Sequence, residues 1–541
     1  MKRVSMLTRH LSICLIVLFA SNLSFAATQE LTAPVPVEDS YYGWSTATDG
    51  QTLVVGAPYE NSSLGAAYVY SRNGLDWDYV TTLEPNYVVT QSSPHFGYSV
   101  DLDGDTIVVG AYSYDSNSID DVGAIFIYEK DINDGWEVEP SVITVDNPQE
   151  GILFGTSVAI DGDTIVVGAT FDDDEKGAAY VYERSGGSWL FDQKLTASDG
   201  EGKGGSRGWG DWFGFSVAID GDIIVAGARQ DKIGSNERQG SAYVFTKSGD
   251  DWAGSVSKLY NSNGLPVDYY GCSVDVSGEV VVVGAYGESK GKVYVYRYDG
   301  QWSLEQQLPQ EPQYSTLYPD SSQDFGYDVA IDGDRIVTGA SRLSGGYVFM
   351  FEWDGVLWSE AIELVPGGGE GYLGRSVAMS GDVIFAGAPF KDGQLQDIGA
   401  VHAFNMVNIM LNAFAKSWLS DDPAFDIAPD GGDGIVNLLD FAALTMPSQP
   451  LTANAGPDQT HFIAGDNPVF ITLDGSGSTG DIVSWLWYWN WDEGGGLEEG
   501  WDEISETDFY PGVYNLTLTI TDSFGNTASD DIEITIIDTS I

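Results

Sequence analysis

The residues best suited to chemistry are oxygen-bearing side chains that gather late in the chain. They are Asp426, Asp430, Asp433, Asn437 and Asp440, and a glycine directly follows the third of them. Closely spaced carboxylates, a glycine for a sharp turn and a late carboxylate are the arrangement of a calcium-binding loop. We therefore expect these residues to hold calcium. The alternative is a solvated acidic loop without a metal.

The elements around this loop are short and helical. Val407–Trp418 has apolar residues at helical spacing before the loop, and a second helical stretch follows it. The loop ending, Asp433-Gly434 with Val436-Asn437 and Asp440, resembles a dockerin repeat. A strict count places Pro429 at the first ligand position, so the front half fits only with a small insertion. The resemblance implies a calcium-binding dockerin-like segment over residues 407–447, with a cohesin-like partner.

Most of the chain repeats one sequence motif with a period of roughly 55 residues, which is typical of solenoids and propellers. Phe154–Tyr182 is the clearest copy and reads as three strands, with an Asp161-Gly162 hairpin between the first two. The copies begin at Tyr42-Gly43, Phe96-Gly97, Phe154-Gly155, Phe213-Gly214, Tyr270-Gly271, Phe325-Gly326 and Leu373-Gly374. Their second strands end at Gly56-Ala57, Gly110-Ala111, Gly168-Ala169, Gly227-Ala228, Gly284-Ala285, Gly339-Ala340 and Gly387-Ala388. Four strands per copy and no helix favour a seven-bladed β-propeller.

This pattern resembles the FG-GAP repeat of integrin-α-like propellers and implies such a propeller over residues 27–406. The calcium loop found in many members is reduced here to hairpins such as Asp103–Asp105, so we interpret these aspartates as turn formers. Acidic loops such as Asp172–Asp174 are kept as an alternative, weak calcium site. The tryptophans that recur at one repeat position are expected to pack between blades: Trp77, Trp136, Trp189, Trp252, Trp302 and Trp358.

The two faces of this propeller should differ. The Asp-Gly-Asp turns lie on one face, and the loops after Gly-Ala share the other face with the links between repeats. These longer loops include Asp115–Asp121, Asp172–Glu175, Asp231–Arg238 and Lys391–Asp397, so we expect the binding site on the long-loop face. The last repeat lacks an outer strand. We predict that the segment Gln29–Ala33 supplies that strand and closes the ring.

The C-terminal part, residues 453–538, has strand-like runs and turn residues but no helix pattern. Its texts NAGPDQT, LDGSGSTGDIVSWLW and GVYNLTLTITDSFGNTASD resemble the PKD domain and imply an immunoglobulin-like β-sandwich. Trp485, Trp487, Trp489 and Trp491 alternate and share one strand face. That face is either core or, together with Trp501, a platform for sugar rings.

Bulk properties restrict location and partners. Lys2, Arg3 and Arg9 precede an apolar run and a small-x-small site near Ala26, so we expect residues 1–26 to be a secretory signal peptide. No later segment is apolar enough to predict a membrane span. The formal net charge of −58 argues against nucleic acid and anionic membranes as partners. Cys272 is the only cysteine after the leader and is expected to be a buried apolar residue.

No catalytic set is evident. His95 and His402 lie in different repeats and His461 lies in the C-terminal part, and no hydrolase triad, zinc motif or phosphate loop is present. We therefore expect a secreted, non-catalytic binding or adhesion protein that recognises polysaccharide or a cell-surface protein. The competing interpretations are a polysaccharide-degrading enzyme or cellulosome-like component, and an adhesion protein without a small ligand.

Overall fold

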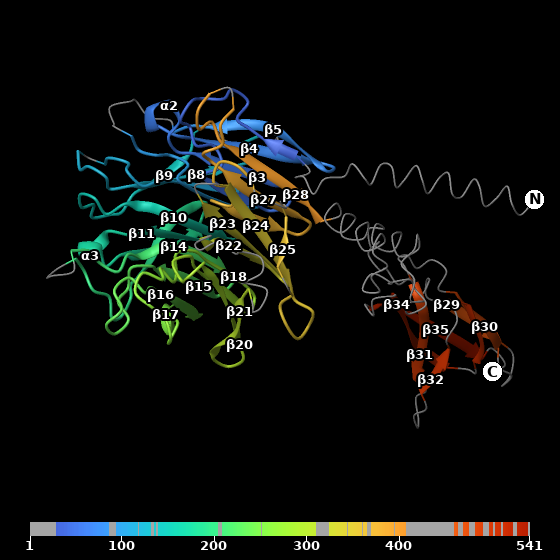
Figure 1. The fold of residues 1–541 in the computed structure, drawn as a ribbon. Helices are drawn as coiled ribbons and strands as arrows, with labels where there is room; N and C mark the ends of the chain where they lie inside the picture. The colour runs from blue at the N-terminus through green and yellow to red at the C-terminus, as the bar shows by residue number, and fades with distance from the viewer. Residues whose placement is uncertain are drawn as a thin grey trace, which may run out of the picture. The chain divides into compact units, whose positions relative to one another are not determined.

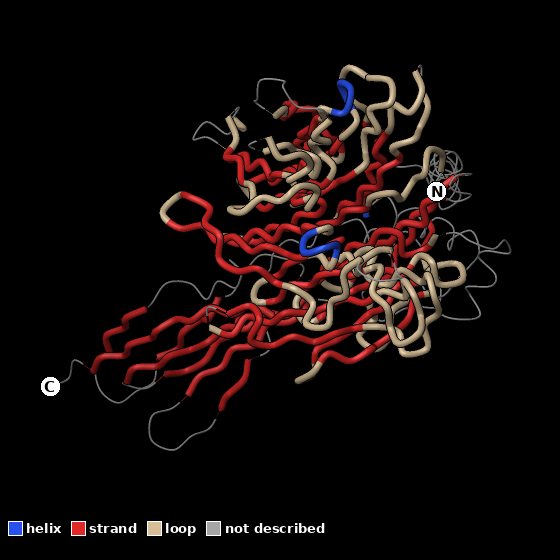
Figure 2. Tube along the Cα trace, turned by 90° about the vertical axis from the view of Figure 1, so that its left-hand side faces the viewer, coloured by secondary structure: helices blue, strands red, loops and turns tan. Residues whose placement is uncertain are grey.

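The computed structural model describes residues 29–406, with gaps, and the strands between residues 459 and 538. The gaps are residues 86–92, 131–134, 137–138, 204–207, 310–323, 343–344 and 365–368, and residues 117, 250, 360 and 394. The chain divides into two units, Met1–Asn412 and Ala413–Ile541. Strands dominate both units (Figures 1 and 2). Among the described residues no helix is long and apolar enough to cross a membrane.

The first unit is a seven-bladed β-propeller whose blades, in its described part, are four-stranded antiparallel sheets. The first four blades are β2 (Ser45–Thr48), β3 (Thr52–Ala57), β4 (Ala66–Asn73) and β5 (Asp76–Leu83); β6 (Ser99–Asp103), β7 (Thr106–Ala111), β8 (Ala124–Glu129) and β9 (Ser141–Ile143); β10 (Phe154–Asp161), β11 (Thr164–Ala169), β12 (Ala178–Ser185) and β13 (Ser188–Leu195); and β14 (Phe213–Asp220), β15 (Ile223–Ala228), β16 (Ser241–Ser248) and β17 (Asp251–Leu259).

The remaining blades follow the same order. They are β18 (Val274–Ser277), β19 (Val280–Ala285), β20 (Lys292–Tyr298) and β21 (Trp302–Leu308); β22 (Phe325–Asp332), β23 (Arg335–Arg342), β24 (Gly345–Glu352) and β25 (Ile362–Glu363); and β26 (Val377–Ser380), β27 (Val383–Ala388) and β28 (Ala400–Asn405) with β1 (Gln29–Leu31). The two short helical turns, α2 (Glu60–Ser63) and α3 (Asp172–Glu175), lie in loops after second strands.

The ring closes through β1, as the sequence predicts. Gln29, Glu30 and Leu31 pair antiparallel with Ala403, His402 and Val401 of β28. Lys391 Nζ also lies 2.6 Å from a carboxylate oxygen of Glu30. The N-terminal segment is therefore the outermost strand of blade seven, and it covers an edge that would otherwise be open.

Second strands such as β3 and β7 are buried along their whole length. Their valine, isoleucine and leucine side chains point to both faces of the blade and pack against both neighbouring blades, so these strands suit β-branched residues. Trp77, Trp252 and Trp358 are buried against the preceding blade, in agreement with the predicted packing between blades, and Trp77 packs edge-on against Phe385 of blade seven at 4.8 Å. Trp136 and Trp189 are partly exposed at the sheet edge, where Lys130 and Arg184 lie over their rings.

Close contacts between glycines of adjacent blades explain the two signatures of the repeat, the Gly-Ala pair and the Phe/Tyr-Gly pair. A Cβ atom added to Gly168 would lie 2.0 Å from the carbonyl oxygen of Gly214 in the next blade. The same conflict of 1.9–2.3 Å recurs at all seven Gly-Ala glycines, and it ends with Gly387 against Gly43, where blade seven meets blade one. Only glycine allows backbones of adjacent blades to approach this closely.

The second unit contains β29 (Gln459–Ile463), β30 (Val469–Asp474), β31 (Ile482–Asn490), β32 (Leu497–Gly500), β33 (Ile504–Phe509), β34 (Gly512–Asp522) and β35 (Thr527–Asp538). Five of them form one sheet in the order β29-β35-β34-β31-β32, and β30 pairs with β33. The alternating tryptophans Trp485–Trp489 lie on β31. The predicted signal peptide and the dockerin-like segment 407–447 lie outside the described residues.

Candidate binding site at the channel mouth

A β-turn at the start of each blade positions side chains around the central axis. In blade one the N–H of Trp44 donates to the carbonyl of Tyr41 at 3.1 Å, and Gly43 occupies the third turn position with φ +89°. A positive φ at that position favours glycine, which explains the Phe/Tyr-Gly pair. The first and last turn residues therefore meet at the end of the channel that faces the long loops.

Residues just after the Gly-Ala pairs lie at the same end of the channel as these turn residues. Together the two sets form a band of aromatic rings. We name this band the aromatic rim. Its members are Tyr41, Trp44, Tyr59, His95, Tyr98, Tyr112, Phe171, Trp212, Phe215, Tyr269, Tyr286, Tyr327, Tyr372 and Phe390, and all are partly exposed.

Ring contacts divide the rim into three arcs, one of which is formed by Phe171, Trp212 and Phe215 of blades three and four. In blades seven, one and two, the ring centroids of Trp44 and Tyr98 are 5.5 Å apart, and Tyr59 lies edge-on to His95 at 4.9 Å. In blades five and six, Tyr286 lies 5.3 Å from Tyr327. Burial lowers the pKa of His95, so its ring is neutral near pH 7. The rim consequently presents a nearly continuous aromatic surface.

Two arginines are inserted among these rings. Arg375 lies 4.1 Å over Trp44 and 4.9 Å over Tyr327, and so connects the arc that contains Trp44 with the arc that contains Tyr327. Arg229 lies 4.9 Å over Trp212 and 3.7 Å over Phe215. Such cation–π contacts help to hold each guanidinium in place. Arg375 also opposes the rise that burial causes in the pKa of the Asp328 carboxyl.

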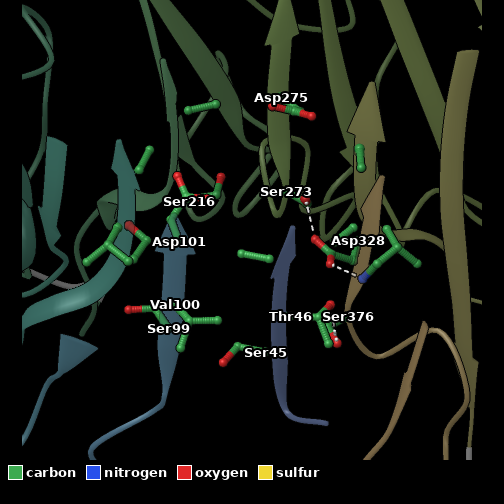
Figure 3. A pocket seen from close by; sticks show the side chains of 18 of the residues that line it. Ser45, Thr46, Ser99, Val100, Asp101, Ser216, Ser273, Asp275, Asp328 and Ser376 are labelled. Atoms are coloured by element: carbon green, nitrogen blue, oxygen red, sulfur yellow. Dashed lines mark hydrogen bonds between the residues drawn. The ribbon is translucent and has the colours of Figure 1, made fainter. Parts of the chain in front are cut away.

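Behind the rim, the innermost strands of all seven blades line a cavity of about 320 Å³. Serine hydroxyls form its upper ring, and most bond to the next blade: Ser99 Oγ donates to the Gly155 carbonyl at 2.9 Å, for example. In blade five Cys272 takes this place, with Sγ 3.2 Å from the Gly326 carbonyl. Figure 3 shows these side chains around the cavity. Cys272 is buried, as predicted.

Three carboxyl groups, Asp101, Asp275 and Asp328, also line the cavity. The innermost strand of each blade has a free inner edge, so its amides need other partners. Asp101 accepts the Ile160 N–H at 2.8 Å, and Asp275 accepts the Ile331 N–H at 2.7 Å. Burial raises the pKa of both carboxyls to about 7, although these amides stabilise their charged forms.

The opposite face is built of tight turns whose aspartates hold neighbouring blades together. Asp161 accepts the N–H of Gly221 at 2.6 Å, and Asp332 accepts that of Gly381 at 2.7 Å. The sequence predicts turn formers here. The structure adds that they bridge adjacent blades.

The acidic loops contribute less than the sequence suggests. Asp172 is buried and lies 2.6 Å from Lys194, and Asp173 lies 2.8 Å from Lys176. Asp231 is likewise buried against Lys258 at 2.7 Å. Lysines thus pair with Asp172 and Asp173, and the weak calcium site at Asp172–Asp174 stays a prediction. In the described residues, no three His, Cys, Asp or Glu side chains are grouped to hold a metal ion.

The predicted calcium ligands lie outside the described residues: Asp426, Asp430, Asp433, Asn437 and Asp440. The structure therefore brings together a site that the motif analysis missed. A usable signal was present, since aromatic residues recur at three repeat positions: before Phe/Tyr-Gly, directly after it, and within two residues after Gly-Ala.

Comparison with protein families identifies the repeat. The model described as "FG-GAP repeat" matches residues 25–70, 90–128, 138–182, 189–245 and 253–296. The chain contains FG-GAP repeats. Two further blades, which start with β22 and β26, lie beyond the last match and have the same turn and glycine contacts. The FG-GAP signature thus marks the contacts between blades.

Three solved structures are similar at low identity. Sqt1 of Chaetomium thermophilum, bound to the N-terminus of a ribosomal protein, is 13% identical, with 65% of this chain and 86% of that chain covered and a TM-score of 0.37. The β-propeller domain of the Trilobed protease from Pyrococcus furiosus is 12% identical, with 63% and 90% covered and a TM-score of 0.37. A Lactobacillus plantarum protein is 14% identical, with 62% and 86% covered and a TM-score of 0.39. No curated protein matches the chain.

Proposed function

We propose that this chain is a secreted, non-catalytic binding protein that recognises a polysaccharide at the channel mouth of its propeller. The observation that supports the proposal is the aromatic rim around a cavity of about 320 Å³. Aromatic faces complement the C–H faces of sugar rings, and partly exposed Tyr and Trp are efficient recognition residues. Recognition of a surface protein at the same rim is the second form of this function.

The two faces of the propeller support this choice of site. On the turn face, aspartates such as Asp161 are committed to amides of the next blade. On the loop face, the rings of the rim contact one another and remain partly exposed, so a ligand can reach them without breaking contacts between blades.

The proposal extends to the other modules. The segment 407–447 is a dockerin-like calcium module with Asp426, Asp430, Asp433, Asn437 and Asp440 as ligands, and residues 453–538 are a PKD-like immunoglobulin-like sandwich. Both act as stabilising or attachment elements beside the propeller. A cohesin-like protein is the partner that the dockerin resemblance suggests.

A glycan array probed with the intact secreted chain tests the proposal. We expect binding to a polysaccharide without release of reducing sugar, and loss of that binding in Trp44→Ala. Trp189→Ala is the matched control, because Trp189 is a partly exposed tryptophan on outer strand β13. Sugar release would support the competing enzyme interpretation instead. Absence of any glycan binding would contradict polysaccharide recognition and favour a protein ligand.

A further inference from the structure

We infer that the channel mouth selects an acidic polysaccharide, whose carboxylate or sulfate groups bind between Arg229 and Arg375 while its sugar rings lie on the aromatic rim. This inference rests on the proposed function and adds a ligand class to it. The charge state and the partners of the two arginines carry it.

The first argument is that, within the described residues, these arginines form no ion pair although the chain is strongly acidic; Arg375 acts only at longer range on the Asp328 carboxyl. Most other arginines in the described residues form ion pairs: Arg72 with Asp382 at 2.5 Å, Arg184 with Glu129 at 3.1 Å, Arg297 with Glu305 at 2.6 Å and Arg335 with Glu352 at 3.4 Å. Within the described part of the chain, the guanidinium groups of Arg229 and Arg375 make cation–π contacts but no ion pair. The Nε atom of Arg229 is buried without a hydrogen bond.

The second argument is that the two cations act on the same place. Arg375 and the ring of Tyr98 line the cavity. Burial raises the pKa of Tyr98, and both Arg375 and Arg229 oppose that rise. The two arginines come from blades seven and four, and both act electrostatically on the phenol of Tyr98 in blade two. A ligand anion over the mouth would feel both.

The third argument concerns which anion fits. Four rings of the rim already contact the chain's own arginines, namely Trp44, Trp212, Phe215 and Tyr327, so these rings are not open to a cationic ligand. Guanidinium groups bind carboxylates and sulfates through paired N–H donors. The remaining partly exposed rings suit sugar faces, which an acidic peptide does not provide. An acidic polysaccharide therefore uses both features of the mouth.

The net charge of −58 repels an anionic ligand at long range. The two fixed arginines at the mouth would offset this repulsion once the ligand is close. Long-range repulsion acts over about 8 Å at physiological salt and about 3 Å at 1 M. Contacts inside the mouth are screened much less. Binding should therefore be measured at elevated salt, about 0.5 M, where the repulsion is weak and the local contact persists.

The experiment compares matched charged and neutral sugars on the full chain by calorimetry. The probes are polygalacturonate with its methyl ester for carboxylate, and dextran sulfate with dextran for sulfate. We expect at least one charged member to bind about tenfold or more tightly than its neutral counterpart. Arg229→Met with Arg375→Met should remove that difference, because methionine keeps the packing on the rings and loses the charge.

The controls separate charge from folding. Arg229→Lys with Arg375→Lys should retain part of the preference, and Arg184→Met should leave it unchanged, because Arg184 stacks on Trp189 away from the mouth. Retained binding of the neutral sugar shows that a variant is folded. Equal binding of charged and neutral sugars, or methionine variants that keep the preference, would overturn the inference while the proposed function stands.

Two further outcomes are decisive. If polyglutamate binds as tightly as the acidic polysaccharide, the ligand class is an acidic peptide and the inference is wrong. If no carbohydrate binds at all, the proposed function itself fails.

Discussion

At the scale of single residues, partly buried carboxyls in the channel wall link the stability of the propeller to pH. Asp101 has a pKa of about 7 in the folded chain against a usual value of 3.8. Folding therefore favours its protonated form. As pH rises through this interval the unfolded chain loses the proton first, so the contribution of Asp101 to stability falls from about pH 4 to about pH 7 and then stays constant.

Asp101→Asn tests this link. The asparagine can still accept the Ile160 N–H but does not titrate. We expect the urea stability of the variant, relative to the parent, to increase between pH 4.5 and pH 8 by on the order of a few kcal/mol. Asp76→Asn, at an exposed site, is the control for the amide substitution itself. A constant difference for Asp101→Asn would exclude a role for this carboxyl.

Gly168 tests the contact between blades. Its φ is not in the left-handed region, so the requirement for glycine comes from the 2.0 Å approach of its missing Cβ to the Gly214 carbonyl. Gly168→Ala should cost about 1–3 kcal/mol or more in thermal unfolding. At Gly200 a Cβ would meet its nearest neighbour at 3.4 Å, so Gly200→Ala should be within about 0.5 kcal/mol of the parent. Equal effects would argue against close packing as the cause.

Which residues the sequence could reveal depends on how their contacts repeat. Gly56-Ala57 and Tyr42-Gly43 recur because every blade makes the same backbone approach. Trp44 and Arg375 occupy one repeat position but differ in type, so motif analysis does not single them out. That Trp44 and Arg375 lie in contact at the channel mouth is seen only once the folded ring brings the turns of all seven blades around one axis.

At the scale of elements, β1 determines whether the ring is closed. A chain that begins at residue 34 should unfold at a lower temperature than one that begins at residue 27, because β28 then has an open edge. We also expect concentration-dependent association through that edge, measured by size-exclusion chromatography with light scattering. Identical melting and a monomeric elution for both chains would show that β1 contributes nothing to closure.

The calcium loop belongs to the same scale and stays a prediction. Calorimetry on the full chain should show an ion bound with a Kd of about 10⁻⁴–10⁻³ M, the range of extracellular sites. Asp433→Asn with Asp440→Asn should abolish that heat. Asp172→Asn serves as the control, because Asp172 is paired with Lys194. Unchanged calcium binding in the double variant would place the ion elsewhere.

At the scale of the whole molecule, the repeated residues hold the blades together and the irregular ones form the mouth. The hairpin and Gly-Ala patterns were sufficient to predict seven blades and two different faces. The missing outer strand of the last repeat predicted closure by Gln29–Ala33, of which Gln29–Leu31 pair with β28. Within the acidic loops, Asp172 and Asp231 are buried against lysines of their own blades. Charge along a sequence does not reveal whether its partner is solvent, a ligand or a neighbouring strand.

Oxidative footprinting with mass spectrometry, on the intact chain with and without its bound polysaccharide, tests the central claim most directly. The account predicts protection of rim residues such as Trp44, Tyr59 and Trp212 on ligand binding. Trp189 and Leu190, on outer strand β13, should be modified equally in both samples. Protection confined to residues outside the rim, with the rim still fully reactive, would contradict a binding site at the channel mouth.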